Sequence, residues 1–229
     1  MRFKAAVVAG LLVASSGAAA QDVSRAVADG GIKVAGWQGK IDASEAKQGA
    51  KLEGAKLVKV GDDLRVTTGP ALAYWNPSNV ATGNYTVKAT FTEEKYMGLN
   101  NHPHPYGLFI GGSDMGTDKQ SYLYCMAYGD GRFIVRGFNG DSTFRLNARG
   151  EPHAAINKAS GVGASVTQEI ALSAKGNKIE CAINGQVVGS YDKSLALGDK
   201  KLKSTDGLYG IRFGHNTDAV VKGLALTKQ

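Results

Sequence analysis

The chain has 229 residues, a formal net charge of +7 and 31 glycines. Its lysines and arginines form no run longer than two residues and no basic helical stripe, which excludes an obvious nucleic-acid-binding patch. Beyond the N-terminus, no apolar stretch approaches the roughly 18 residues that a membrane-spanning helix needs, so we expect no membrane insertion. The high glycine content is typical of many short strands joined by tight turns.

Residues 1–20 predict a secretory signal peptide. Arg2 and Lys4 make a positive start, residues 5–13 form a short apolar core, and three alanines precede Gln21. Removing this segment takes away two positive charges and no acids, which lowers the formal net charge from +7 to +5. We therefore predict an exported protein, periplasmic or extracellular, in which residues 21–229 form a single domain.

The sequence pattern after the signal peptide favours strands over helices. Residues 41–51 contain helix formers but no apolar stripe, which indicates a loop or one short helical turn. Residues 84–92 alternate strictly, with Tyr85, Val87 and Phe91 among the residues on one face. This alternation predicts a half-buried strand.

The rest of the chain predicts further strands joined by tight turns. The expected elements are a hairpin over residues 121–140, a surface loop over 147–165, three strands over 169–191 and two strands over 207–226. The turn at Asn184-Gly185 is a strong hairpin signal. We predict an all-β fold, a two-sheet antiparallel β-sandwich of the jelly-roll type, with an open barrel as the alternative.

Two cysteines remain after residue 20, Cys125 and Cys181. Each is flanked at two-residue spacing by apolar residues, so both are expected to point into the core. An exported compartment permits a disulfide between them. The alternative is a pair of inert buried thiols.

Several motifs in this order carry a resemblance: "GPALAYWNP", "ATGNYTVKATF", "HPYGLFIGG", "DGRFIVRGFNG" and "GIRFGHNTD". Together they resemble a group of exported bacterial proteins with a concanavalin A-like lectin/glucanase fold, which are laminin-G-like sandwiches related to the 3-keto-disaccharide hydrolase-like domain. The resemblance spans residues 36–226. It implies a ligand groove on a concave sheet face, but no particular reaction, because lectins, glycanases, lyases and adhesion modules share the fold.

Tyrosines and arginines gather on one predicted sheet face. In "SYLYCMAY", the alternation places the tyrosines opposite the core residues, and arginines of the next strand share their side. Aromatic rings stack on sugars, and arginine donates to hydroxyls or to uronate carboxylates. A covering loop, such as residues 147–165, would instead bury this face. The predicted ligand-binding residues are His104, Tyr106, Tyr122, Tyr124, Tyr128, Arg132 and Arg136.

The motif "HPHP" raises the possibility of a metal site, because His102 and His104 share one side of an extended segment. Neither remaining histidine is tied to them by spacing, so we favour a stiff segment that leads into a strand, with His104 as a polar wall of the groove. We predict no metal site and no cofactor, although calcium at a sandwich rim stays open.

The sequence predicts no catalytic residues. The Glu-x-Asp-x-x-Glu run of glucanases with this fold is missing, and Glu93 and Glu94 are adjacent, so they point to opposite faces of a strand. The favoured hypothesis is an exported, non-catalytic protein that binds a glycan or polysaccharide. The alternatives are a carbohydrate-active enzyme with a site around His104, Tyr124 and Arg136, and an envelope module that binds another protein.

Overall fold

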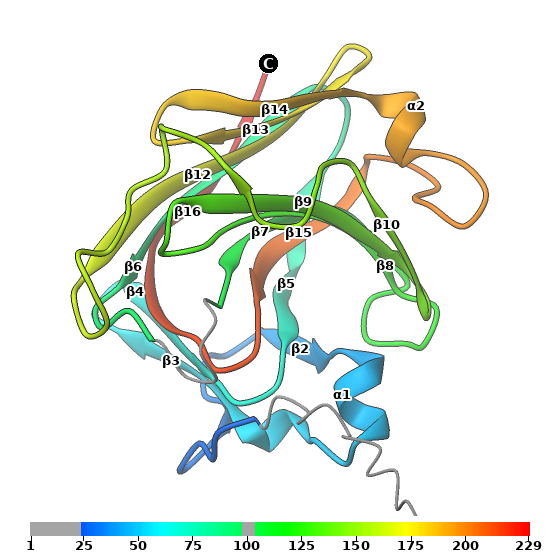
Figure 1. Ribbon diagram of the computed structural model, residues 1–229. Coiled ribbons are helices and arrows are strands. Elements are labelled where there is room, and N and C mark those ends of the chain that lie inside the picture. Colours follow the sequence, from blue (N-terminus) through cyan, green and yellow to red (C-terminus); the bar gives the residue numbers. More distant parts are fainter. Residues whose placement is uncertain (1–23, 98–103) are drawn as a thin grey trace, which may run out of the picture.

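The computed structural model describes residues 24–97 and 104–229 (Figure 1). The predicted signal peptide and His102 lie outside the described residues. The fold consists of two curled sheets packed face to face, as the sequence predicted. The first sheet contains, in spatial order, β1 (Gly31–Ile32), β3 (Ala55–Val60), β4 (Asp63–Thr68), β16 (Asp218–Lys228), β6 (Tyr85–Glu93), β12 (Val166–Lys175), β13 (Lys178–Ile183) and β14 (Gln186–Asp192).

The second sheet carries the features that concern function. It contains, in spatial order, β10 (Ser142–Arg145), β9 (Arg132–Asn139), β8 (Ser121–Ala127), β7 (Tyr106–Ser113), β15 (Gly207–Phe213), β5 (Leu72–Ala81) and β2 (Gln38–Ile41), with the short β11 (Glu151–Pro152) beside β9. Every pairing between named strands is antiparallel except the two-residue contact of β1 with β3.

Within the part of the chain that the structure describes, helical structure is limited to short turns. The described helices are α1 (Ala43–Lys47), the 3₁₀ turn η1 (Leu52–Gly54) and α2 (Lys193–Ala196). Because α1 has five residues, the prediction of one short helical turn in this region is confirmed. A search of the described helices for one long and apolar enough to span a membrane finds none.

The predicted hairpins are confirmed. The turn between β13 and β14 has positive φ at both Asn184 and Gly185, 50° and 80°, which suits a two-residue hairpin turn and explains the Asn-Gly pair. Residues 147–165 form a mostly irregular segment, as predicted, but this segment is anchored to the sandwich. Ile156 packs into the core between the sheets, and Asn157 hydrogen-bonds Gln168 of β12.

The core between the sheets explains the alternation of the strands. Tyr85, Val87 and Phe91 of β6 are buried there, as the sequence predicted. Tyr106 is also fully buried in this core, with its ring centroid 5.6 Å from that of Phe91. The prediction of Tyr106 as a ligand-binding residue is therefore wrong, because β7 turns this ring toward the first sheet.

Bulges bend the second sheet. The register of β7 shifts between Ile110 and Ser113, and that of β15 shifts between Leu208 and Gly210 where the two strands pair. Bulges increase local twist and bend the strands that contain them. Gly111 at the bulge has φ of 64°, a conformation that glycine adopts without strain.

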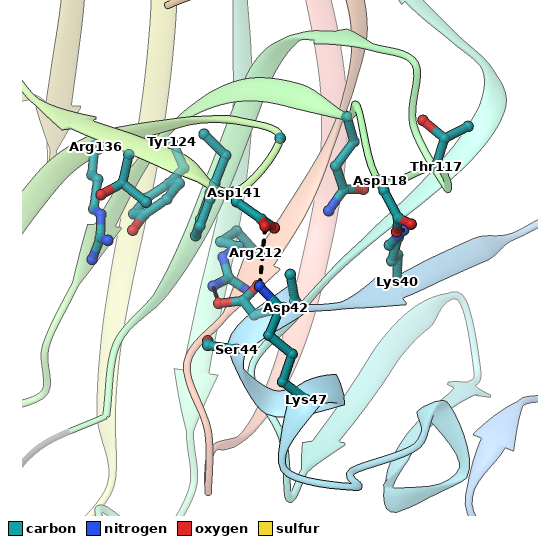
Figure 2. A pocket seen from close by; sticks show the side chains of 15 residues that line it. Lys40, Asp42, Ser44, Lys47, Thr117, Asp118, Tyr124, Arg136, Asp141 and Arg212 are labelled. Carbon is teal, nitrogen blue, oxygen red and sulfur yellow. Dashed lines mark hydrogen bonds and ion pairs between the residues drawn. The ribbon is translucent and has the colours of Figure 1, made fainter. Parts of the chain in front are cut away.

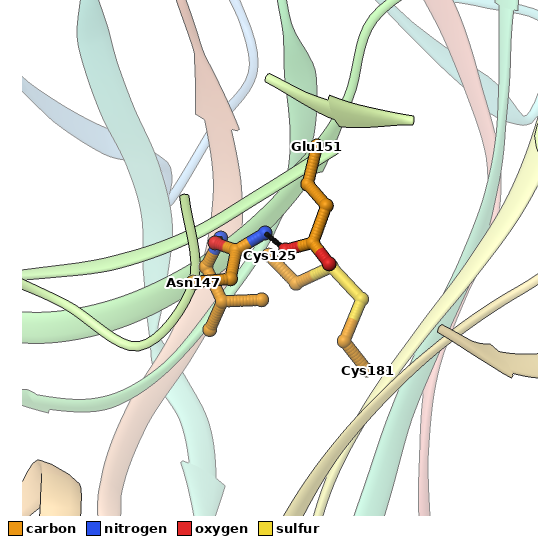
Figure 3. Close-up of a disulfide and its surroundings, with 5 residues drawn as sticks. Cys125, Asn147, Glu151 and Cys181 are labelled. Atoms are coloured by element: carbon orange, nitrogen blue, oxygen red, sulfur yellow. Dashed lines mark hydrogen bonds between the residues drawn. A yellow bond between two sulfur atoms is a disulfide. The ribbon is translucent and has the colours of Figure 1, made fainter. Parts of the chain in front are cut away.

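A disulfide between Cys125 and Cys181 joins the two sheets (Figure 3). Cys125 lies on β8 of the second sheet and Cys181 on β13 of the first, and both are fully buried. Their Cα atoms are 6.1 Å apart, so the bond crosses the core directly. The bond closes a loop across 56 positions of sequence.

We expect protein from an oxidising compartment to show no reactive thiol after denaturation. The double variant Cys125→Ala/Cys181→Ala should lose about 4 kcal/mol of unfolding free energy, because the unfolded chain regains the entropy of an open loop of this length. Thiol titration and denaturant unfolding measure the two effects. Two titratable thiols in the denatured wild type would contradict the crosslink.

Glu93 is a buried carboxyl at the end of β6. It is 1% exposed, its Oε1 accepts a hydrogen bond from the Met97 backbone N–H at 3.1 Å, and its Oε2 has no partner among the residues described. Burial raises the pKa of Glu93 to about 7, against the lowering effect of the Met97 hydrogen bond and with a smaller raising effect from Asp218. The folded protein therefore binds this proton more tightly than the unfolded chain does.

This shift makes the protein less stable as pH rises through the interval from about 4.5 to about 7. Between pH 4 and pH 8, the wild type should lose about 3 kcal/mol more unfolding free energy than Glu93→Gln, which cannot ionise. The comparison uses the change in unfolding free energy between pH 4 and pH 8. Any change in stability that the glutamine causes equally at both pH values therefore cancels. Glu94→Gln is the control: Glu94 is exposed and pairs with Arg65, so its replacement should keep the wild-type slope. Equal slopes for wild type and Glu93→Gln would refute the assignment.

Candidate ligand-binding site

The second sheet is apolar on its outer face as well as on its inner face. We call this outer surface the aromatic face. Its buried members form a cluster separate from the core between the sheets, with Met115, Phe138 and Leu208 packed against it. The cluster contains Ala73, Trp75, Phe109, Tyr122, Tyr124, Met126, Tyr128 and Ile134. The predicted partition of β8 and β9 into core and outer residues is therefore confirmed.

A pocket opens on the aromatic face (Figure 2). Its volume is about 400 Å³, and Tyr124, Arg136, Phe138 and Arg212 supply its sheet side. The remaining lining residues come from β2 and α1, the turn before β8, and the β9–β10 hairpin: Lys40, Asp42, Ala43, Ser44, Lys47, Thr117, Asp118, Gln120, Gly140, Asp141 and Thr143. Figure 2 shows Tyr124 and Arg136 side by side at one end, with Lys40 and Asp118 at the other.

A buried ion pair holds the sheet to the wall of the pocket. Arg212 Nη2 donates to Asp42 Oδ2 at 2.5 Å, and the two side chains are 3% and 12% exposed. Burial alone would lower the pKa of Arg212, but the neighbouring Asp42 carboxylate outweighs this effect and raises it. The guanidinium therefore stays charged. Its carbon lies 5.5 Å from the ring centroid of Tyr124 and 5.6 Å from that of Phe138, within range of cation–π attraction.

The ion pair also explains the local geometry of α1. Asp42 is the residue before the helix, a position where an aspartate commonly caps the first backbone N–H groups. Here its side chain makes no capping bond, because its carboxylate is turned to Arg212. Asp42 is held in place by its own backbone N–H, which donates to the Ala71 carbonyl at 2.9 Å.

Two further ion pairs lie at the pocket rim. Lys40 Nζ is 2.7 Å from Asp118 Oδ1, and Lys47 Nζ is 3.0 Å from Asp141 Oδ2. The first joins β2 to the turn before β8, and the second joins α1 to the β9–β10 turn. Exposed pairs of this kind contribute about 0–1 kcal/mol each, so they order the rim more than they stabilise the fold.

The structure brings together only two of the predicted ligand-binding residues. Tyr124 and Arg136 are register partners on β8 and β9, and both line the pocket. Tyr122 is fully buried beneath the face, with ring centroids 5.1 Å from Phe109 and 5.3 Å from Phe138. Its prediction as a ligand contact is wrong, because the neighbouring rings cover it.

Tyr128 and Arg132 share the aromatic face but do not line the pocket. They lie at the β8–β9 hairpin, where the Arg132 guanidinium carbon is 5.6 Å from the Tyr128 ring centroid. Arg132 is also paired with Asp130, with Nε and Oδ2 2.7 Å apart. Their predicted role as ligand-binding residues therefore stays a prediction.

His104 is 1% exposed and does not line the pocket either. Its ring packs against His215 with centroids 4.7 Å apart, and His215 Nδ1 lies 3.8 Å from Glu45 Oε1. The prediction of His104 as a groove wall is wrong, because the residue precedes β7 at an end of the sandwich. Within residues 24–97 and 104–229, no group of three or more His, Cys, Asp or Glu side chains is placed to hold a metal.

Two residues of the pocket, Arg212 and Asp42, were not predicted from the sequence. A signal for Arg212 was present: it stands between Ile211 and Phe213 in a strand, so its side chain must leave the core on the side of the tyrosines. Nothing local identified Asp42, which lies 170 residues from its partner.

No family model matches the sequence, and no curated protein does. The structure is similar to many solved ones, and three of these illustrate the fold. They are the carbohydrate-binding module CBM66 from Bacillus subtilis (8% identity, 87% of this chain and 99% of that one, TM-score 0.55), a Bacillus subtilis protein of unknown function with a galectin-like fold (12%, 84% and 89%, 0.52) and the endo-β-1,3-glucanase of Pyrococcus furiosus (12%, 84% and 88%, 0.50). These similarities establish a lectin/glucanase type of fold. The link to the 3-keto-disaccharide hydrolase-like domain stays a prediction.

The two kinds of ion pair at the pocket should differ in their effect on stability. Asp42→Asn leaves Arg212 buried without its counter-charge and should cost about 3–5 kcal/mol of unfolding free energy. Asp141→Asn breaks an exposed pair and should cost less than about 1 kcal/mol. Denaturant unfolding of both variants tests this. Equal small losses would show that Arg212 has another way to compensate its charge.

Proposed function

We propose that this protein is an exported, non-catalytic glycan-binding protein whose ligand occupies the pocket above Tyr124. The observation that carries the proposal is the pocket itself, in which an aromatic ring and arginine donors meet on the bent second sheet. A sugar ring presents C–H groups for stacking and hydroxyls for hydrogen bonding, and this combination matches both features.

The fold supports a glycan as the ligand class to test first. A carbohydrate-binding module and a β-1,3-glucanase are among the proteins with similar folds. Because fold alone does not assign function, these similarities support only the class of ligand, and the pocket residues support the binding site.

The carboxylates of the pocket favour binding without hydrolysis. A glycosidase needs an acid and a base or nucleophile, usually two carboxyl groups about 5–10 Å apart on either side of the scissile bond. Asp42, Asp118 and Asp141 line the pocket, and each is held by a lysine or arginine. Each carboxylate is therefore already bonded to a cation; the Lys40 hydrogen bond lowers the pKa of Asp118, whereas burial raises the pKa of Asp42.

Two observations support export. The N-terminal residues have the pattern of a signal peptide, and a disulfide crosses the core. Structural disulfides persist in oxidising compartments. Periplasmic or extracellular location remains part of the proposal.

The proposal is tested by filling the pocket from its exposed wall. Ser44 lies on α1, lines the pocket and is exposed, so Ser44→Trp should block the pocket without disturbing the core. Against a panel of laminarin, dextran, polygalacturonate and alginate, we expect the wild type to bind at least one polymer. We expect Ser44→Trp to weaken that binding at least about 10-fold, with little change in Tm.

Ser190→Trp is the matched control, because Ser190 is exposed on β14 of the other sheet. It should bind like the wild type. No binding to any polymer would refute the proposed function. Release of reducing ends from a bound polymer would assign the pocket to an enzyme instead.

A further inference from the structure

Two arginines are paired in the register of β9 and β10, and one of them, Arg136, lines the pocket. Arg136 of β9 and Arg145 of β10 are directly opposite in the register of these antiparallel strands. On β10, Phe144 packs against the core between the sheets, so the next residue, Arg145, is on the side of Arg136. Like charges directly opposite on a sheet are destabilising. Neither arginine is in an ion pair with any residue in the described part of the chain.

The pocket lining has one cation more than it has carboxylates. Four lining residues are basic and three are acidic, and each acid is bonded to one base. These pairs are Asp42 with Arg212, Asp118 with Lys40, and Asp141 with Lys47. Arg136 is the basic lining residue left over.

The pocket also holds buried donors that lack acceptors. The Nε atoms of Arg136 and Arg212 are buried and make no hydrogen bond to any described residue. An unsatisfied buried donor costs about 1–3 kcal/mol, more when it is charged, so these two arginines are held at a cost to stability. The Arg136 guanidinium lies 5.4 Å from the ring centroid of Phe138, and this contact fixes the plane in which it can donate.

We propose that the pocket recognises an acidic sugar, with its carboxylate on Arg136. This inference rests on the proposed glycan-binding function. The planar guanidinium presents two parallel N–H donors that match the two oxygens of a carboxylate. Arg136 is partly exposed and lines the pocket, whereas its register partner Tyr124 is 3% exposed and supports it from within the sheet.

The surrounding acids define which anions fit. Asp42, Asp118 and Asp141 line the same pocket, so a densely charged polymer would place further negative groups beside them. A polymer with one carboxylate on each sugar brings fewer negative groups to the pocket and meets less repulsion. The geometry therefore favours a polyuronate over a heavily sulfated polysaccharide or a nucleic acid.

The direct test compares polymers that differ only in charge. Binding of the full protein to polygalacturonate, alginate and hyaluronan is measured by calorimetry, with methyl-esterified polygalacturonate as the uncharged match of the first and dextran sulfate as the dense polyanion. We expect at least one polyuronate to bind. For polygalacturonate, esterification should weaken binding at least about 10-fold.

Variants then assign the effect to Arg136. Arg136→Ala should weaken polyuronate binding by about 10- to 100-fold, the value of one charge-assisted bidentate contact. Arg136→Lys keeps the positive charge but loses the two parallel N–H donors, so we expect an intermediate loss of affinity. This variant provides the test if the alanine variant folds poorly. Lys228→Ala, on the exposed end of β16 in the other sheet, removes the same charge and should have no effect.

Four results would overturn the inference. Binding to laminarin or dextran, but to no polyuronate, would refute the acidic ligand and leave the proposed function in place. Equal losses of polyuronate affinity in Arg136→Ala and Lys228→Ala would show that binding depends only on net charge. Tighter binding to dextran sulfate than to any polyuronate would show the same. No binding to any polymer, neutral or acidic, would refute both proposals.

Discussion

The Arg212–Asp42 ion pair connects everything that shapes the pocket. Arg212 projects from β15 near the middle of the second sheet, and Asp42 lies between the edge strand β2 and α1. Their bond draws α1 over the aromatic face, and Tyr124 and Phe138 stack against the same guanidinium. Because the arginine cannot give up its charge, burying it requires the carboxylate. This one ion pair therefore holds α1, which forms a wall of the pocket, against the sheet residues that form its floor.

The second sheet can support such a pocket because the first sheet and the disulfide fix it from behind. Cys125 faces the core from β8, and Tyr124, its neighbour in sequence, faces the pocket. Any shift of β8 would therefore disturb both the crosslink and the aromatic floor. A binding surface on a rigid strand loses little conformational entropy when a ligand arrives.

Much of the fold could be predicted from the sequence, because a strand divides its residues between two faces with a period of two. The rule placed Tyr85, Val87 and Phe91 in the core and Tyr124 and Arg136 on the outer face. The same rule was less informative for Tyr106. Because β7 is buried on both faces, polar and apolar residues do not alternate along it, and the sequence does not show which face Tyr106 takes. His104 precedes that strand, where no periodicity applies. The burial of Tyr122 was also not predicted, because it depends on contacts with Phe109 and Phe138 from neighbouring strands.

The pocket itself was harder to predict, because its charges come from distant parts of the chain. Lys40 and Asp118 are 78 residues apart, and Lys47 and Asp141 are 94 apart. Each residue alone resembles ordinary solvated surface; only the pairing shows which charge is compensated. The alternation of β9 predicted that Arg136 lies on the outer face. Its importance depends on which charges of the pocket are paired in space, and the sequence does not show this. The three acids around it already have partners, so Arg136 is the cation with which a ligand can pair.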